Sequence, residues 1–181
     1  MKNTLLLLPL LLMIGCTPLI VQKPVGSNYK PEELKRFEGT WLHTANDDPT
    51  VLHIKKVNDD GEFIAANLNW VDDDQKFEIE ENRFILKHGN QFGILHISPQ
   101  DREEDLYLIT LFKVIDEKTI HYWATDKEKA QAFLDSGTLE TKEIDGDQVI
   151  TDTAENIIRA LESNQSEIFD PEYVILTKIT E

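Results

Sequence analysis

Cysteine is almost absent from the chain, since Cys16 is the only one in 181 residues. A single cysteine excludes an internal disulfide and the paired cysteines of a structural zinc site. Basic residues are also scarce, with 18 Lys and Arg against 34 Asp and Glu, and the formal net charge is −16. Nucleic acid is therefore not an expected partner, because its phosphates require a basic surface.

Long apolar runs are missing as well. The run from Leu5 to Ile14 spans ten residues and contains Pro9, whereas a membrane-spanning helix needs about 20. A run of this length behind the basic Lys2 is typical of the middle of a secretory signal peptide. Small Gly15 and then Cys16 follow it.

This arrangement resembles the signal of bacterial lipoproteins, with Met13 at the place where that family prefers Leu. The resemblance implies cleavage between Gly15 and Cys16, diacylglycerol on the Cys16 sulfur and an acyl chain such as palmitate on the new N-terminus. A free thiol or an intermolecular disulfide at Cys16 is the alternative. In the enterobacterial sorting rule, Asp after the cysteine retains a lipoprotein in the inner membrane. Thr17 therefore points to the periplasmic face of the outer membrane.

Three segments follow from this interpretation. Residues 1–15 are expected to be a signal peptide that is removed, and residues 16–28 a lipidated cysteine and its tether. Two prolines and a glycine in this stretch favour a flexible tether, which would span on the order of 20 Å. Residues 29–181 are expected to form a single β-rich globular domain, held at the membrane through the N-terminal lipid.

Strand signals dominate that domain. The turn Asn58–Gly61 separates two apolar segments and predicts a hairpin, and in the second of them Ile64, Ala66, Leu68 and Trp70 share one face. The predicted strands are residues 51–57, 62–70, 78–86, 91–98, 106–115, 119–124 and 173–179.

Helices are expected at three places. Pro31 opens a short one that runs to Phe37, and two more lie between the late strands, one capped by Thr125 and one by Asp152. The predicted fold class is mainly β with inserted helices, an antiparallel meander that forms a closed or half-open barrel. The last strand is expected to pair with the first, near Trp41.

The stretch around Gly39-Thr40-Trp41 resembles the opening motif of lipocalins, in which a short helix precedes Gly-x-Trp and the Trp closes the base of the barrel. The resemblance implies a lipocalin-like, or calycin-like, barrel. Two departures stand out: Lys127 replaces the aromatic of a second family motif, and Lys178 is the only candidate for the Arg that packs over the family's Trp. The part from Tyr122 onward also resembles small uncharacterised bacterial lipoproteins.

Catalytic motifs are not found, and no catalytic, metal-binding or cofactor-binding residue is assigned. Ser27 and Lys30 satisfy Ser-x-x-Lys but lie at the predicted tether. The histidines in or near strands are expected to be isolated polar residues rather than a metal site. They are His43, His53, His96 and His121.

Large aromatic residues are the remaining candidates for a binding site. They are expected either to line a pocket for an apolar ligand or to fill the core, and they are Trp41, Trp70, Phe92, Phe112 and Trp123. Three functions stay open. The first is a non-enzymatic envelope lipoprotein that binds a partner, the second a lipocalin-like carrier of a lipid or other small apolar ligand, and the third an enzyme acting on envelope glycans.

Overall fold

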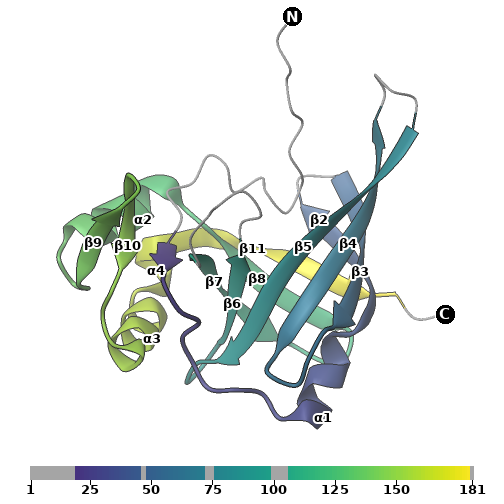
Figure 1. The fold of residues 1–181 in the computed structure, drawn as a ribbon, viewed down its shortest axis with the longest axis horizontal. Coiled ribbons are helices and arrows are strands. Elements are labelled where there is room, and N and C mark those ends of the chain that lie inside the picture. The colour runs from purple at the N-terminus through teal and green to yellow at the C-terminus, as the bar shows by residue number, and fades with distance from the viewer. Residues whose placement is uncertain (1–18, 46–47, 72–75, 99–105, 180–181) are drawn as a thin grey trace, which may run out of the picture.

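Most of the barrel is built from the predicted hairpins. A computed structural model describes residues 19–45, 48–71, 76–98 and 106–179; side chains at 45, 48, 69–71, 76 and 77 lie outside that description. Eight antiparallel strands pair in the order β2-β3-β4-β5-β6-β7-β8-β11, and β11 pairs with β2 to close the barrel (Figure 1). These strands are β2 (Gly39–Ala45), β3 (Asp48–Lys56), β4 (Glu62–Val71), β5 (Lys76–His88), β6 (Gly93–Ser98), β7 (Tyr107–Val114), β8 (Thr119–Thr125) and β11 (Phe169–Lys178).

The predicted fold class is confirmed as a lipocalin-like β barrel with inserted helices. The expected pairing of the last and first strands is present, with Lys178 opposite Trp41. The short helical stretch predicted at Pro31–Phe37 is present as α1 (Pro31–Leu34) and the 3₁₀ helix η1 (Lys35–Phe37), and it covers one end of the barrel (Figure 1). We call this end the closed end. Among the described residues, no helix has the length and apolarity needed to cross a bilayer.

An insert between β8 and β11 packs on the outer wall of the barrel (Figure 1). Its helices begin one residue later than predicted, because Asp126 caps the first and Thr153 the second through their side-chain oxygens. The Asp152 carboxylate instead accepts from the backbone N–H of Thr153 and Glu140. The insert comprises α2 (Lys127–Asp135), β9 (Thr141–Ile144), β10 (Asp147–Ile150), α3 (Ala154–Ser163) and α4 (Gln165–Ile168).

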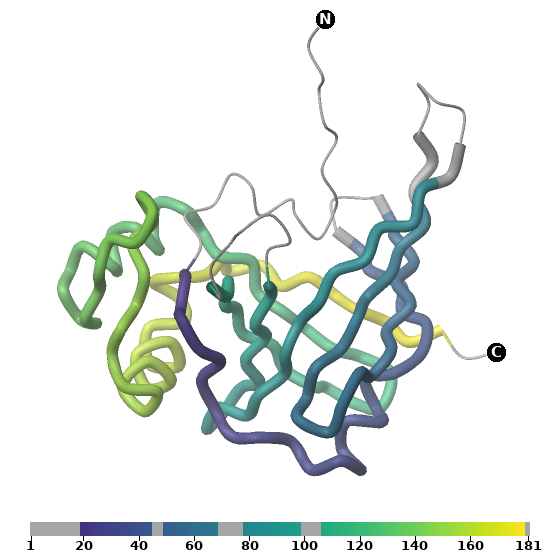
Figure 2. Tube along the Cα trace, viewed as in Figure 1, coloured from purple at the N-terminus to yellow at the C-terminus, as the bar shows by residue number. Residues whose placement is uncertain are grey.

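The predicted tether is wrong from Leu19 onward. Strand β1 (Leu19–Val21) is buried at all three residues, and it lies between β7 and β10. Further along, Val25 is also buried, and Ser27 exchanges backbone hydrogen bonds with His88. Figure 2 shows this segment passing from the insert along the barrel to α1. Pro24 and Gly26, which suggested flexibility, therefore belong to an ordered segment with long-range partners.

Two main groups of buried apolar side chains result. The barrel core lies inside the barrel, and it comprises Tyr29, Leu34, Phe37, Trp41, Leu52, Phe63, Ala65, Phe84, Leu86, Ile97, Phe112 and Ile120. The outer core lies between the barrel wall, β1 and the insert, and it comprises Leu19, Val21, Val25, Ile94, Ile109, Leu111, Ala130, Phe133, Leu134, Leu139, Ile150, Ile157, Ala160, Leu161, Ile168 and Phe169. Strands β6 and β7 contribute side chains to both groups, and accordingly β7 carries apolar side chains on both of its faces.

The predicted face of β4 points outward. Phe63 and Ala65 fill the barrel core, so Ile64, Ala66 and Leu68 face outward. Leu68 is 58% exposed and its partner Ile79 on β5 is 70% exposed. A row of exposed apolar residues, which we call the apolar row, therefore crosses the outer wall at Val51, Leu68 and Ile79.

Candidate functional site

The closed end has the geometry that the Gly39-Thr40-Trp41 motif led us to expect. The indole Nε1 of Trp41 donates to the Phe37 carbonyl at 2.9 Å, which joins the first strand to η1. Gly39 has φ +118°, and a Cβ there would lie 3.1 Å from Cε of Lys178. Glycine thus allows the chain to turn into β2 while the lysine side chain passes close by.

Lys178 occupies the position over the tryptophan. Its Nζ lies 5.4 Å from the centroid of the Trp41 ring and donates to the Arg36 carbonyl at 3.1 Å. A cation over an indole face is attracted by the ring's negative charge density. The lysine therefore fixes the last strand to the base of the barrel, in the place that the resemblance assigns to an arginine.

The four aromatic candidates whose side chains the structure describes lie in two separate groups. Trp41 and Phe112 lie in the barrel core, whereas Phe92 and Trp123 pack against the outer core with ring centroids 5.4 Å apart. The side chain of Trp70 lies outside the described residues. Gly15 and Cys16, the predicted cleavage and lipidation site, also lie outside them. The described aromatic residues thus have packing roles, on two sides of one barrel wall.

A polar pair inside the barrel was not assigned from the sequence. His43 on β2 is 2% exposed, and its Nε2 lies 2.6 Å from the Tyr122 hydroxyl on β8. The two rings are nearly parallel, at 23°, with centroids 5.9 Å apart. Tyr122 also lies opposite Phe112 of the barrel core. The pair therefore places hydrogen-bonding groups among apolar side chains.

One nitrogen of this pair has no partner. His43 Nδ1 is the single buried side-chain polar atom without a hydrogen bond among the residues that the structure describes. Such an atom costs about 1–3 kcal/mol, so native proteins rarely leave one unpaired. If the tyrosine donates to Nε2, Nδ1 carries the ring proton and is a donor; in the other tautomer Nδ1 is an acceptor. In both tautomers, Nδ1 can form one further hydrogen bond inside the barrel.

Burial favours the uncharged form of both members of the pair. It lowers the pKa of His43 and raises the pKa of Tyr122, because an apolar surrounding disfavours imidazolium and phenolate alike. Asn67, Asn82 and Thr110 are other buried polar residues of the barrel strands. The interior thus has uncharged hydrogen-bonding groups beside the aromatic side chains of the barrel core.

The other histidines lie apart from this pair. His53 on the outer wall contacts Thr40 Oγ1 at 3.1 Å, and His121 stacks on Tyr173 with centroids 3.9 Å apart. His96 lies on the outer-core side of β6, where its Nε2 accepts from the Val25 N–H at 2.9 Å. Across the described part of the chain, no three His, Cys, Asp or Glu residues are placed to hold a metal ion.

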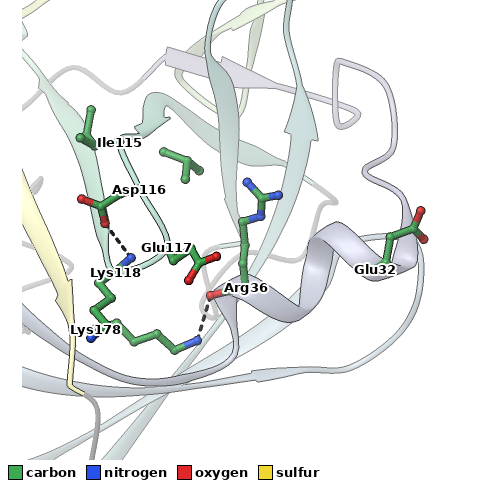
Figure 3. Close-up of a pocket in the computed structure, with 8 residues that line it drawn as sticks. Glu32, Arg36, Ile115, Asp116, Glu117, Lys118 and Lys178 are labelled. Atoms are coloured by element: carbon green, nitrogen blue, oxygen red, sulfur yellow. Dashed lines mark hydrogen bonds between the residues drawn. The ribbon is translucent and has the colours of Figure 1, made fainter.

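A surface pocket of about 620 Å³ lies at the closed end (Figure 3). Its charged lining is balanced, with Arg36, Lys118 and Lys178 against three acids, Glu32, Asp116 and Glu117. Lys178 is engaged with the Arg36 carbonyl, and the backbone N–H of Lys118 with the Asp116 carboxylate. The balanced charges and exposed lining make it a weaker site than the interior pair.

The sequence does hold one signal for His43. His43 stands two residues after Trp41, and residues two apart on a strand point to the same side of the sheet. An inward Trp41 therefore implies an inward His43. The sequence holds no such signal for Tyr122, because the side of the sheet to which it points follows from the pairing of β8 with β7 and β11.

Comparison with protein-family models, curated proteins and solved structures finds no match to this chain.

Proposed function

We propose that this protein is a lipid-anchored binding protein of the bacterial cell envelope, with its ligand site in the barrel around His43 and Tyr122. The ligand class is a small, largely apolar molecule that carries one uncharged hydrogen-bonding group. The unpaired His43 Nδ1 is the observation that carries the proposal. A ligand that bonds to it would relieve the cost of a buried unpaired nitrogen.

The anchor part of the proposal rests on residues 1–17. The short apolar run, Gly15 and Cys16 resemble a lipoprotein signal, and Thr17 favours the periplasmic face of the outer membrane. Cys16→Ala is expected to leave the chain uncleaved and without acyl groups, as measured by intact-protein mass spectrometry. An acylated Cys16→Ala protein would refute the anchor at this residue.

Native mass spectrometry of protein extracted from its own membrane tests the ligand. We expect a co-purifying small molecule on the wild type and its loss from His43→Phe, which keeps an aromatic ring but removes both nitrogens. His53→Phe is the matched control, because His53 lies on the outer wall of β3. A mass equal to the acylated chain alone, or a ligand retained by His43→Phe, would contradict the barrel site.

A second candidate is the interaction module, which a different observation favours. The apolar row at Val51, Leu68 and Ile79 is exposed on the outer wall, and contiguous exposed apolar residues often mark protein contacts. Leu68→Lys would then remove a co-purifying protein, whereas the barrel site predicts that it leaves the small ligand bound. The two candidates are therefore separable in one set of extracted samples.

A further inference from the structure

The chain is fixed very close to its expected lipid. Leu19 and Val21 are 0% and 1% exposed in β1, and the Val25 N–H donates to His96 Nε2 on the outer face of the barrel wall. Cys16 stands three residues before Leu19. Three residues span at most about 11 Å even when fully extended. The lipid attachment point thus lies within about 11 Å of a residue that is packed into the fold.

That residue lies on one particular side of the molecule. β1 pairs with β7 through Leu19–Ile109 and with β10 through Ile20–Val149. Continuing this register places Leu19 level with Gln148, whose partner on β9 is Glu143. Two strand spacings, or about 10 Å, therefore separate Leu19 from Glu143.

The opposite side of the barrel is equally well defined. In the closed order of eight strands, three strands separate β3 from β7 in either direction. β3 therefore lies across the barrel from the strand that holds β1. Lys55 on β3 is exposed, while its neighbour Ile54 packs on the barrel core, so Lys55 marks the outer face of that far wall.

We propose that the side formed by β1, β9 and β10 faces the lipid surface, and that the wall containing β3 faces away from it. The proposal rests on the lipid anchor proposed above. A short link to a buried strand leaves the domain little freedom to reorient, unlike the flexible tether of about 20 Å that the sequence suggested. The barrel is then presented with a fixed side toward the membrane.

Charge indicates what kind of contact this is. The β9–β10 hairpin carries Glu143, Asp145 and Asp147 against Lys142, so it has no basic patch for anionic lipid. The anchor rather than headgroup attraction must hold this side near the bilayer. A zwitterionic phosphatidylethanolamine or phosphatidylcholine surface is therefore the lipid chemistry that fits.

Single-cysteine labelling tests the orientation in the full, lipidated chain. Because the only native thiol is used by the lipid, a cysteine introduced as Glu143→Cys or Lys55→Cys takes a fluorophore alone. Each labelled protein is reconstituted in phosphatidylcholine vesicles that contain a headgroup nitroxide lipid. We expect quenching several-fold stronger at position 143 than at position 55, and equal or reversed quenching would overturn the proposal.

A linker variant provides the matched control. Inserting eight Gly and Ser residues between Thr17 and Pro18 lengthens the link ahead of β1 and should bring quenching at the two positions close together. If the linker changes nothing, the short link is not what orients the domain, and the inference fails. Mass spectrometry of the same samples reports the acyl groups on Cys16, so an absent anchor is distinguished from an anchored but freely turning domain.

Discussion

The barrel core and the outer core use the same strands, β6 and β7, but they are assembled in different ways. Neighbouring hairpins supply most of the barrel core, and its closed end is completed by η1 and Lys178. The outer core joins β1, the barrel wall and the insert through contacts between distant residues. Val25 and His96 are 71 positions apart, and Glu162 and Asn90 are 72 apart.

This difference explains what each region contributes. The barrel core holds the His43–Tyr122 pair and thus the proposed ligand site, whereas the outer core holds β1 and thus the proposed orientation at the membrane. The two are not independent, since the outward Ile94 and the inward Ile97 both belong to β6. Substitutions in each core should therefore lower the stability of one cooperative unit, by amounts that depend on burial.

The largest effect is expected at the closed end. Trp41→Ala removes a side chain that is 1% exposed, its bond to the Phe37 carbonyl and the ring beneath Lys178. The free energy of unfolding should fall by about 3–5 kcal/mol, as measured by urea unfolding followed with circular dichroism. Trp123→Ala, at a partly buried site beside the outer core, should cost less. Equal losses would mean that burial does not distinguish the two regions.

Next in size is the test of β1. Leu19→Ala should lower the free energy of unfolding by about 2–5 kcal/mol, because Leu19 is 0% exposed in the outer core. Gln22→Ala, at an exposed neighbour, should change it by less than about 0.5 kcal/mol. If Leu19→Ala were as mild as Gln22→Ala, the segment would behave as the tether that the sequence suggested.

The same two regions show what could be predicted from sequence. Turn residues such as Asn58–Gly61 and period-two patterns predict hairpins because strand pairing there is local. The pattern in β4 was misleading: Ile64 and Leu68 are apolar but outward, since the smaller Ala65 and polar Asn67 share the inner face with Phe63. Hydrophobicity alone did not tell the inner from the outer face there.

β1 could not be predicted for a different reason. Leu19-Ile20-Val21 is only three residues long, and both of its partners lie far away in the chain, at Ile109 and Val149. Local pattern has no information on such pairings. The helix caps were missed by one residue because Thr125 and Asp126, like Asp152 and Thr153, are both good caps, and the choice depends on the surrounding fold.

Acid is expected to act on the outer core through His96. Burial lowers the pKa of this imidazole from 6.5 to about 4, and its Nε2 must stay unprotonated to accept from Val25. The unfolded chain therefore takes up the proton more readily than the folded one. Stability that is present above pH 6.5 should fall by on the order of 3 kcal/mol as the pH drops toward 4.

Urea unfolding of the wild type and His96→Gln between pH 7 and pH 4 measures this effect. The variant should be less stable at pH 7 but should lose less of its stability on acidification. His53→Gln, at an exposed site, should keep the wild-type slope. A slope unchanged in His96→Gln would show that other groups, such as acids in turns, account for the pH dependence.

Glu162 connects the insert to the barrel, and its removal should lower the stability by less than the substitutions above. One carboxylate oxygen accepts from three successive backbone N–H groups, those of Asn90, Gln91 and Phe92. Glu162→Ala should lower the free energy of unfolding by about 1.5–3 kcal/mol, since the hydrogen bonds are charge-assisted. Glu155→Ala, which removes an exposed pair with Arg159 on the same helix, should cost about 0.5 kcal/mol or less. Similar losses for the two variants would mean that the hydrogen bonds from residues 90–92 to Glu162 add nothing to stability.

The smallest effect should come from Lys178, where the barrel is closed. Lys178→Met keeps the length of the side chain but loses the cation over Trp41 and the bond to the Arg36 carbonyl, so about 0.5–1 kcal/mol should be lost. Lys178→Arg should retain the wild-type stability, because guanidinium also stacks on an indole. Thermal unfolding of the two variants separates charge from packing. A stable methionine variant would mean that apolar contact alone closes the barrel, and that the base depends on Trp41 rather than on the cation above it.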